Sequence, residues 1–357
     1  MDLIKALERF GRRLIVFCVA LVLRRRQRPP DLADDTRVLV VRLDERLGNL
    51  LLLTPFLTSL KQRFPQGRID LLANARGAPA IAAHPTLNAF IGFRKRALFA
   101  ADGPLRTPFR LRRRRYDLVI DAGNPTDPSV TQALITRICA GVHSIGPAHG
   151  AFAACYSAPA AVPASPADDV HEIVLRRALL TPLGDVPPVN SLSAPEFAAP
   201  KSDAPAVRFR GRLLDKPIGI VNLGARLADK RLDAKAYATL AGLVQDHGCH
   251  CVLTYGPAER ELVESVQAHT AGVWLAPPTD VPALAYLFAE AKVVITCDTG
   301  PMHLAVAVGT PTLGLFVSTS PKRYGYADAP HGVVDLRSTA VADAVGDIDA
   351  WLTARLR

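Results

Sequence analysis

The sequence contains no apolar run long enough to span a bilayer and no C-x-x-C pair of cysteines. The ten apolar residues of Leu14–Leu23 are half of the about 20 that a membrane-spanning helix needs. The six cysteines are scattered, mostly inside apolar runs, which indicates reduced, buried thiols in a cytosolic compartment. In Cys249-His250-Cys251, alternation along a strand directs the imidazole away from both thiols, so no metal site is expected there.

Two common nucleotide-binding motifs are also missing. Neither G-x-G-x-x-G nor G-x-x-x-x-G-K-[ST] occurs, so neither a dinucleotide fingerprint nor a P-loop is supported. The basic segments of the chain carry no nucleic-acid recognition motif. A nucleic-acid partner is therefore not expected.

The residues that are present describe a globular protein with unevenly placed charge. Hydrophobic residues make up 49% of the chain, which excludes a disordered protein. The length of 357 residues fits two domains of roughly 150–180 residues each. Of the formal net charge of +10, residues 1–30 carry +6 and residues 94–115 carry +8. The rest of the chain has a net charge of −4. Outside these two basic segments, the protein is therefore mildly acidic.

The first basic segment, residues 1–30, is predicted to form a membrane-associating helix. Two arginines precede its apolar run, and four arginines and a Pro-Pro pair follow it, in place of the small residues of a signal-peptide cleavage site. A basic, apolar helix of this kind lies in the membrane interface, where each Lys or Arg near anionic lipid contributes on the order of 1 kcal/mol. The alternative is a helix packed on the domain surface or an oligomer contact.

From residue 31 onward, short β-branched runs alternate with helical segments, the pattern of parallel βαβ units in an α/β doubly wound sheet. The expected strands are 37–43, 68–73, 88–93, 116–122, 141–145, 217–222, 249–255, 274–275, 292–297 and 312–316, and the expected helices include 50–64, 233–247, a short one from 301, and 341–356. A stretch rich in Pro, Ala and Ser at 186–215 is the expected linker between Rossmann-like domains at 31–185 and 216–357. Two such halves face a central cleft with the carboxyl ends of their strands.

The first candidate loop closes the first expected strand. Asp44 and Glu45 supply two carboxylates, and Arg42 and Arg46 supply two guanidinium groups. Gly48 begins a helix at the same edge. This composition suits a general base beside an anion site, and the alternative is an exposed polar turn.

The second candidate loop follows the expected strand at 217–222. Gly224 and Ala225 form a turn, and Lys230 follows shortly after it. Backbone amides of such a turn and the charge of a lysine can together hold a phosphate.

The third candidate loop lies between a buried strand and a helix. Asp298 or Thr299 can cap the helix, and Pro301 suits its first turn. Free N–H groups at such a helix start attract a pyrophosphate. Asp298 can accept a hydrogen bond from a sugar hydroxyl, and His303 shares a helical face with Thr299. The alternative is a capping box with a core histidine.

Together, the three loops resemble the heptosyltransferase-type glycosyltransferases, glycosyltransferase family 9. The resemblance covers most of residues 36–330. The segments that carry it are Asp298-Thr299-Gly300-Pro301-Met302-His303-Leu304-Ala305 with Gly309-Thr310-Pro311, Arg42-Leu43 through Gly48, Leu53-Thr54-Pro55-Phe56-Leu57, Gly224-Ala225 with Asp229-Lys230, Gly256-Pro257-Ala258-Glu259, and His171-Glu172 before Leu183-Gly184.

The resemblance implies a GT-B fold in which the two domains bind different substrates. The C-terminal domain would bind a nucleotide sugar, typically ADP-heptose, and the N-terminal domain a growing lipopolysaccharide core on the inner leaflet. The donor-binding residues implied by position are Gly224, Ala225, Lys230, Glu259, Asp298, Thr299, Gly300 and His303. Lys230 would neutralise the leaving diphosphate, and Glu259 would lie near the nucleoside. No metal or other cofactor is expected, because a helix N-terminus and a lysine can stabilise that leaving group.

The chain departs from the family pattern at Asn49. The family usually has Gly-Asp at this helix start, with the Asp as the proposed base, whereas here Gly48 and Asn49 follow a loop that is one residue longer. An amide cannot take a proton from the acceptor hydroxyl. We therefore expect Asp44, or else Glu45, to serve as the base of an in-line displacement with inversion. A different acceptor or weak catalysis is the alternative.

The second basic segment, 94–115, falls in the acceptor-side domain. Arg112 and Arg113 are expected to bind phosphates of a lipid-linked saccharide acceptor, and the alternative is a solvated helix face. The sequence thus predicts an inverting, metal-independent glycosyltransferase that is peripheral on the inner face of the cytoplasmic membrane. The alternatives are a GT-B enzyme with another nucleotide sugar or acceptor, and a catalytically silent membrane-bound scaffold of the same fold.

Overall fold

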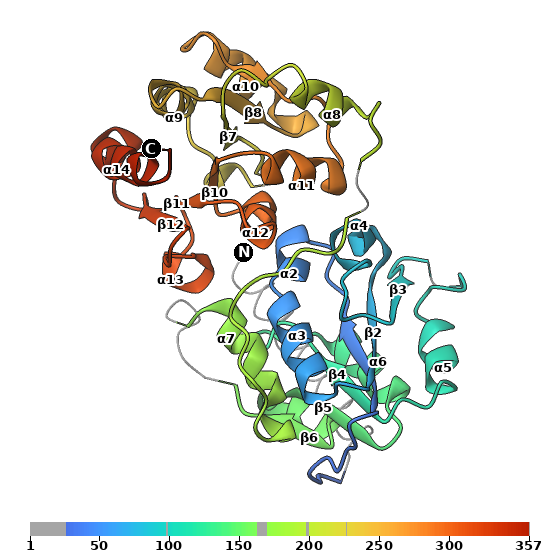
Figure 1. Cartoon of the computed structure of the whole chain (residues 1–357). Helices are drawn as coiled ribbons and strands as arrows, with labels where there is room; N and C mark the ends of the chain where they lie inside the picture. Colours follow the sequence, from blue (N-terminus) through green and yellow to red (C-terminus); the bar gives the residue numbers. More distant parts are fainter. Residues whose placement is uncertain (1–25, 98, 163–169, 198–199, 226, 357) are drawn as a thin grey trace, which may run out of the picture. The chain divides into compact units, whose positions relative to one another are not determined.

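The computed structural model describes residues 26–97, 99–162, 170–197, 200–225 and 227–356. Most of the expected membrane-associating helix at residues 1–30 lies outside these ranges. The chain divides into two compact units, of which the first takes in the described residues of 1–45, 53–167 and 172–190. The second unit takes in those of 46–52, 168–171 and 191–357. Each unit is an α/β structure with its own parallel sheet (Figure 1).

The first unit is built on six parallel strands in the order β3-β2-β1-β4-β5-β6. The strands are β1 (Arg37–Arg42), β2 (Arg68–Asn74), β3 (Ala89–Phe93), β4 (Leu118–Asp121), β5 (His143–Pro147) and β6 (Ala158–Ala160). The helices are α3 (Thr54–Arg63), α4 (Ala78–Ile81), α5 (Thr107–Arg112), α6 (Val130–Cys139) and α7 (Glu172–Arg177).

Strand β1 lies at the centre of this sheet because both of its faces are apolar. Leu39 and Val41 pack with Leu111 of α5 and Ile135 of α6 in one buried cluster. Helices α3 and α7 contact each other side by side (Figure 1). The buried strand ends abruptly at polar residues, and this change places Arg42 and the residues after it at the carboxyl edge of the sheet.

The second unit repeats the architecture with the strand order β12-β11-β10-β7-β8-β9. The strands are β7 (Ile218–Asn222), β8 (His250–Thr254), β9 (Trp274–Leu275), β10 (Val293–Cys297), β11 (Thr312–Phe316) and β12 (Gly332–Asp335). The helices are α2 (Leu47–Leu51), α8 (Pro205–Arg210), α9 (Ala234–Asp246), α10 (Arg260–Gln267), α11 (Val281–Ala289), α12 (Gly300–Ala307), α13 (Pro321–Tyr324) and α14 (Val345–Leu356).

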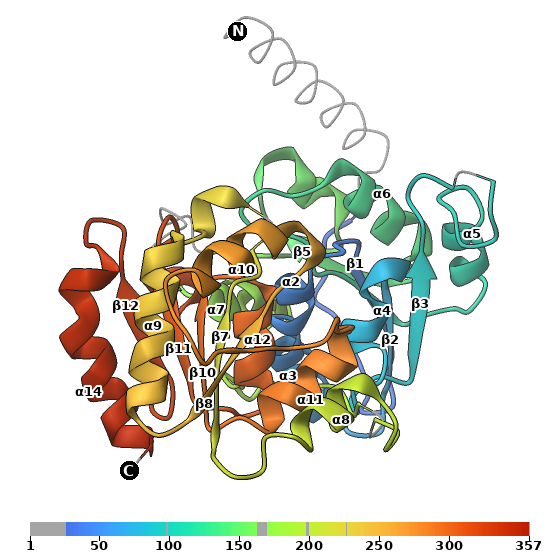
Figure 2. The same cartoon turned by 90° about the horizontal axis from the view of Figure 1, so that it is seen from above.

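Alternation along these strands distributes the helices over the two faces of the second sheet. Val221 and Ile295 belong to the buried cluster that includes residues of α9, α10 and α14. Their neighbours Ile220 and Val294 belong to the cluster of α2, α8, α11 and α12. Figure 2 shows α9 and α14 on one side of this sheet and α8 and α11 on the other. Both faces are thus covered, as continuous apolar strands require.

The helix expected at 50–64 is in fact two helices in different units, which corrects the prediction. Helix α2 ends at Leu51, and α3 begins at Thr54 with Pro55 in its first turn. Proline lacks the N–H that a helix interior needs but is favoured at a helix start, so Pro55 marks a new helix. Helix α2 instead packs on α12 through two glycines. A Cβ on Gly48 would lie 2.6 Å from the ring of His303 and 3.5 Å from the Gly300 Cα.

The other expectations for secondary structure are largely confirmed. Every expected strand is present, with end points shifted by one or two residues, while β6 and β12 were not expected. The linker expected at 186–215 contains the short helix α8. His250 points away from its cysteine neighbours, as alternation predicts: its Nε2 lies 2.8 Å from Asp215 Oδ1, and Cys249 and Cys251 are buried free thiols.

No helix in the described part of the chain combines the length and apolar character needed to cross a membrane.

Candidate active site

A cavity of about 580 Å³ lies within the second unit, beside the carboxyl ends of β7, β8 and β10. It is lined by all eight of the residues predicted to bind the donor: Gly224, Ala225, Lys230, Glu259, Asp298, Thr299, Gly300 and His303. Arg46, Gly48 and Asn49 also line it, because α2 packs with this unit. The structure therefore brings the second and third candidate loops, and the end of the first, to one place.

Asp298 organises the floor of this cavity from the end of β10. Its buried carboxylate accepts hydrogen bonds at Oδ2 from Lys230 Nζ at 2.8 Å and from Thr319 Oγ1 at 2.5 Å. Lys230 Nζ also donates to the Asp298 carbonyl oxygen at 3.0 Å. An ammonium has three N–H groups, so Lys230 is fixed in place with a donor left for a ligand.

His303 extends the same arrangement along α12. Its Nε2 lies 3.8 Å from Asp298 Oδ1, and its Nδ1 lies 2.7 Å from the hydroxyl of Tyr326. The imidazole is buried, so these two contacts and the close approach of Gly48 fix its orientation. Tyr326 was not found from the sequence, since nothing in its neighbourhood marks it as part of a site.

The N-terminus of α12 faces this cavity without a side-chain cap. Thr299 occupies the N-cap position and Pro301 the first turn, but the Thr299 hydroxyl makes no capping hydrogen bond, so the predicted side-chain cap is wrong. Its Oγ1 is buried and has no hydrogen-bond partner among the residues that the structure describes. A helix N-terminus with N–H groups not met by a side chain is suited to bind an anion.

Glu259 fastens two strand-end loops to each other at the other end of the cavity. Its Oε2 accepts from the backbone N–H of Gly256 at 2.8 Å, and its Oε1 from Arg231 Nη2 at 2.6 Å. Arg231 Nε in turn donates to the carbonyl oxygen of Ala225 at 2.8 Å. Because the carboxylate is buried and bonded on both oxygens, it acts as a fixed wall of the cavity.

A polar ladder behind these loops was missed by the sequence analysis. Asn222 Nδ2 donates to Thr296 Oγ1 at 3.0 Å, and Thr254 Oγ1 donates to Asn222 Oδ1 at 3.1 Å. These residues end or nearly end three adjacent strands, β10, β7 and β8. A polar residue at the end of an otherwise apolar strand is the signal that could have indicated them.

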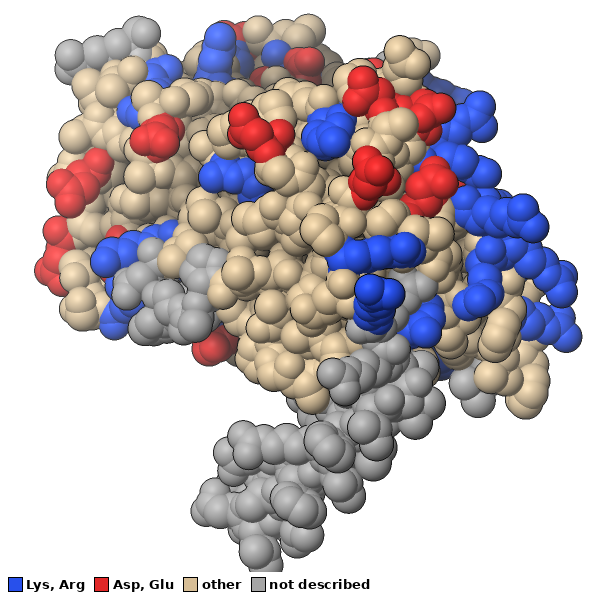
Figure 3. Space-filling model, turned by 90° about the horizontal axis from the view of Figure 1, so that it is seen from below, with Lys and Arg blue, Asp and Glu red and all other residues tan. Residues whose placement is uncertain are grey.

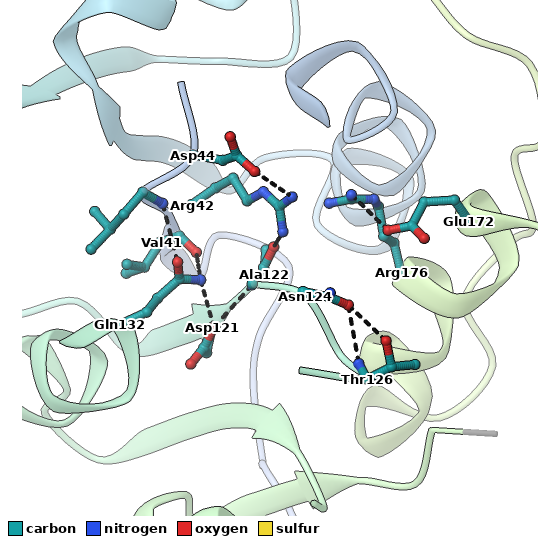
Figure 4. Close-up of polar contacts among 12 residues, drawn as sticks. Val41, Arg42, Asp44, Asp121, Ala122, Asn124, Thr126, Gln132, Glu172 and Arg176 are labelled. Carbon is teal, nitrogen blue, oxygen red and sulfur yellow. Dashed lines mark hydrogen bonds and ion pairs between the residues drawn. The ribbon is translucent and has the colours of Figure 1, made fainter. Parts of the chain in front are cut away.

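A second polar cluster lies in the first unit, at the carboxyl ends of β1 and β4 (Figure 4). Arg42 is buried, and its Nη1 donates to the carbonyl oxygen of Ala122 at 2.9 Å. Its Nη2 lies 3.4 Å from Asp44 Oδ2. The guanidinium group thus anchors the carboxylate expected to be the base, whose side chain is 22% exposed.

Arg176 on α7 brings a second guanidinium group to this cluster. It is 1% exposed, and its Nη2 donates to Glu172 Oε1 at 2.7 Å. In the described part of the chain, Arg176 Nε and Nη1 and Arg42 Nε have no hydrogen-bond partner. Figure 4 shows the two guanidinium groups pointing toward each other. Burial and the charge of Arg176 lower the pKa of Arg42 from 12.5 to about 9, so Arg42 stays cationic at neutral pH.

Asp121, at the end of β4, links the residues that support this cluster. It accepts from the Tyr156 hydroxyl at 2.6 Å and from Gln132 Nε2 at 2.6 Å. Gln132 also accepts from the backbone N–H of Leu43 at 3.1 Å, which ties the loop before Asp44 to the sheet. Burial raises the pKa of Asp121 above its usual value, against the hydrogen bonds that favour its charged form.

The remaining predicted residues lie apart from this cluster. Glu45 Oε2 accepts from Asn74 Nδ2 at 3.3 Å and is about half exposed. Arg112 and Arg113 are exposed at the end of α5 and precede β4, whereas Arg42 follows β1. Since β1 and β4 are parallel, the two arginines lie at the opposite edge of the sheet from Arg42. The structure therefore does not bring them together with the other residues predicted to bind the acceptor.

Arg176 is the residue of this cluster that the sequence analysis missed. His171-Glu172 matches a segment of the family resemblance, whereas Arg176, four residues after Glu172, belongs to none of its segments. A buried ion pair at i, i+4 looks like any surface pair in sequence. Only the packing of α7 shows that Arg176 is buried.

The chain is similar in sequence and in fold to known glycosyltransferases. Residues 106–342 match the family model of glycosyltransferase family 9 (heptosyltransferase). A lipopolysaccharide heptosyltransferase 3 of Escherichia coli is 28% identical over 288 residues, which are 76% of this chain and 81% of the relative.

Solved structures with a similar fold include glycosyltransferases of the same family. A family 9 glycosyltransferase from Veillonella parvula is 18% identical with a TM-score of 0.73, covering 92% of this chain and 99% of that one. The E. coli heptosyltransferase WaaC with ADP is 23% identical with a TM-score of 0.68, covering 88% and 99%. These similarities confirm the GT-B type of fold, two parallel-sheet α/β units.

Proposed function

Because the chain belongs to glycosyltransferase family 9, the heptosyltransferases, we propose that it transfers a heptose from ADP-heptose to a lipopolysaccharide core or a related cell-envelope acceptor. The observation that carries this proposal is Lys230, held by Asp298 beside the uncapped N-terminus of α12 inside one cavity. The names of the relatives support it: a curated relative is a lipopolysaccharide heptosyltransferase, and the WaaC structure contains ADP.

The donor diphosphate binds at the N-terminus of α12. Its negative charge meets the N–H groups of the first turn, the hydroxyl of Thr299 and the ammonium of Lys230. The nucleoside lies toward Glu259, at the other end of a cavity whose volume is typical of small-molecule sites. Charge grows on the diphosphate as the sugar departs, so Lys230 and the helix stabilise the transition state more than the ground state, and no metal is needed.

Asp44 acts as the general base. It takes the proton of the acceptor hydroxyl as that oxygen bonds to the anomeric carbon, and the bond from that carbon to the diphosphate oxygen breaks on the opposite face, which inverts the configuration. Arg42 positions Asp44 through the ion pair at 3.4 Å. Only Glu45 separates Asp44 from Arg46, which lines the donor cavity. Chain connectivity therefore keeps the base within about 8 Å of the cavity wall, measured between Cα atoms.

The buried guanidinium groups recognise an anionic group of the acceptor. Arg42 Nε and Arg176 Nε and Nη1 are N–H donors that no described residue uses. A carboxylate or phosphate satisfies such donors with charge-assisted hydrogen bonds. Arg46 adds a cation at the edge of the donor cavity.

The enzyme meets its acceptor as a peripheral protein on the inner face of the cytoplasmic membrane. The basic and apolar residues 1–30 provide the association. This part of the proposal rests on their sequence, since all but the last few of them lie outside the described residues.

Donor screening by thermal shift tests the proposal. A bound ligand stabilises the native state by mass action, so ADP-heptose at 100 times its Kd should add about 2.7 kcal/mol to the free energy of unfolding. We expect ADP-heptose and ADP to raise the Tm, and UDP- and GDP-sugars to leave it unchanged. Transfer to truncated lipopolysaccharide acceptors is then measured with the donor that binds.

The outcomes separate the alternatives. A Tm rise with a UDP- or GDP-sugar alone would show a GT-B enzyme with a different donor. A Tm rise with ADP-heptose but no detectable transfer to any acceptor would indicate the catalytically silent scaffold. Transfer from ADP-heptose by the purified protein excludes that scaffold.

A further inference from the structure

One edge of the first unit combines positive charge and exposed apolar side chains that no part of the proposed reaction uses. Arg112 ends α5, Arg115 lies three residues before β4, and Val142 immediately precedes β5. This is the edge formed by the amino ends of the strands, opposite to the carboxyl ends at which Arg42 and Asp44 lie. We call this edge, together with α5 and the segment 94–106 that leads from the carboxyl end of β3 to α5, the basic edge.

The positive charge of the basic edge is almost uncompensated. Residues 94–115 contain nine Lys or Arg, all of them exposed, and one acid, Asp102. Asp102 is occupied by Arg94, whose Nε lies 2.6 Å from its Oδ2. Seven of the cations form no ion pair with any described residue: Lys95, Arg96, Arg106, Arg110, Arg112, Arg113 and Arg115. Figure 3 shows Lys and Arg side chains gathered on the side where Figure 1 places α5.

Large apolar side chains are exposed among these cations. Phe109 on α5 is 57% exposed, and Leu105 and Phe99 before it are 51% and 76% exposed. Leu111, by contrast, is buried against α6, so α5 keeps an apolar face inward and still presents an aromatic ring outward. Single exposed apolar residues are ordinary, but three within one highly basic segment indicate an interaction surface.

The basic N-terminal region joins the first unit at the same edge. The backbone N–H of Arg28 donates to the carbonyl oxygen of Ser157, directly before β6, at 2.8 Å. The Arg28 guanidinium donates to the carbonyl oxygen of Val142 at 3.3 Å, and Val142 is 50% exposed. The two basic segments of the chain are far apart in sequence, yet both reach the amino ends of β4, β5 and β6.

We propose that the basic edge docks the enzyme on an anionic lipid bilayer, with Phe109 and Leu105 inserted among the headgroups. Exposed arginines around an apolar centre are the composition that an interface of anionic lipid binds. A phosphate of the acceptor would account for the cations but not for the exposed rings. Docking there leaves the carboxyl end of β1, which β2 separates from β3, free for Asp44 to receive the sugar end of the acceptor.

This inference rests on the proposed function only for the presence of a lipid-linked acceptor, and binding to vesicles requires neither donor nor acceptor. The full-length Phe109→Trp variant is mixed with 3:1 phosphatidylethanolamine/phosphatidylglycerol vesicles whose acyl chains are brominated. Wild-type protein corrects for Trp274 and Trp351. Leu214→Trp is the matched control, because Leu214 is 73% exposed in the second unit, next to the acidic Asp215.

We expect brominated lipid to quench the indole introduced at position 109 and not the one at position 214, even if residues 1–30 also bind the vesicles. Arg110→Gln with Arg113→Gln should lower the vesicle partition coefficient roughly 30-fold in 0.1 M salt. The control pair, Arg208→Gln with Arg212→Gln in the second unit, should change it less than two-fold.

Equal quenching at positions 109 and 214, or none at 109, would overturn the proposal. So would tight binding of a single-stranded oligonucleotide that is lost in the Arg110→Gln, Arg113→Gln variant while vesicle binding is kept, since it would identify a nucleic-acid surface. Donor-induced thermal shifts are measured without lipid. Failure of docking is therefore distinguishable from failure of the proposed function.

Discussion

The cavity of the second unit and the arginine cluster of the first both form at the carboxyl ends of a parallel sheet, but their charges are satisfied differently. In the cavity, each buried carboxylate has a cation within 2.8 Å, Asp298 with Lys230 and Glu259 with Arg231. In the cluster, N–H groups of two buried arginines have no partner among the described residues. The cavity is thus preorganised by its own ion pairs, whereas in our proposal an anion of the acceptor pairs with the arginines of the cluster.

Within the cavity, the largest effect should come from the loss of its cation, Lys230. Lys230→Met removes the charge that stabilises the departing diphosphate, so kcat should fall about 100- to 1000-fold, and ADP should bind more weakly. Steady-state kinetics and calorimetric titration with ADP measure both. Lys235→Met, an exposed lysine on α9 of the same unit, is the control and should behave as wild type. A Lys230→Met enzyme with wild-type kcat would show that the diphosphate does not bind there.

Substitution of Arg176 should have a smaller effect, and it separates the structural role of this residue from its proposed role in binding the acceptor. Arg176→Met breaks a buried ion pair and should lower the free energy of unfolding by about 3–5 kcal/mol, because Glu172 loses its cation. Arg176→Met combined with Glu172→Leu should recover most of that stability, since an apolar pair can replace a buried ion pair. Urea unfolding measures both variants. Arg177→Met, on the same helix, is the control.

The double variant also tests the anion-binding role of Arg176. If the guanidinium recognises the acceptor, the KM for the acceptor should stay raised even when stability has returned. A double variant with both wild-type stability and a wild-type KM would reduce Arg176 to a structural residue.

The same contrast explains which parts were predictable from the sequence. The residues predicted to bind the donor lie in or near short loops after apolar strands, so Gly224, Asp298 and His303 could be identified from local pattern. Arg176 could not, because its burial depends on the packing of α7. The break in the helix expected at 50–64 was signalled by Pro55, but the transfer of α2 to the second unit depends on the contact between Gly48 and Gly300, which sequence spacing does not show.

The central claim is that Asp44 replaces the missing family carboxylate at Asn49. It is tested most directly by the rate of transfer from ADP-heptose catalysed by Asp44→Asn, measured with the Kd for ADP and with Glu45→Gln as the matched control. An amide cannot accept the proton, so transfer by Asp44→Asn should fall below detection while the Kd for ADP changes less than about two-fold. Glu45→Gln should keep most of its activity, since Glu45 is half exposed and does not contact Arg42 in the described structure. Wild-type turnover by Asp44→Asn would contradict the claim.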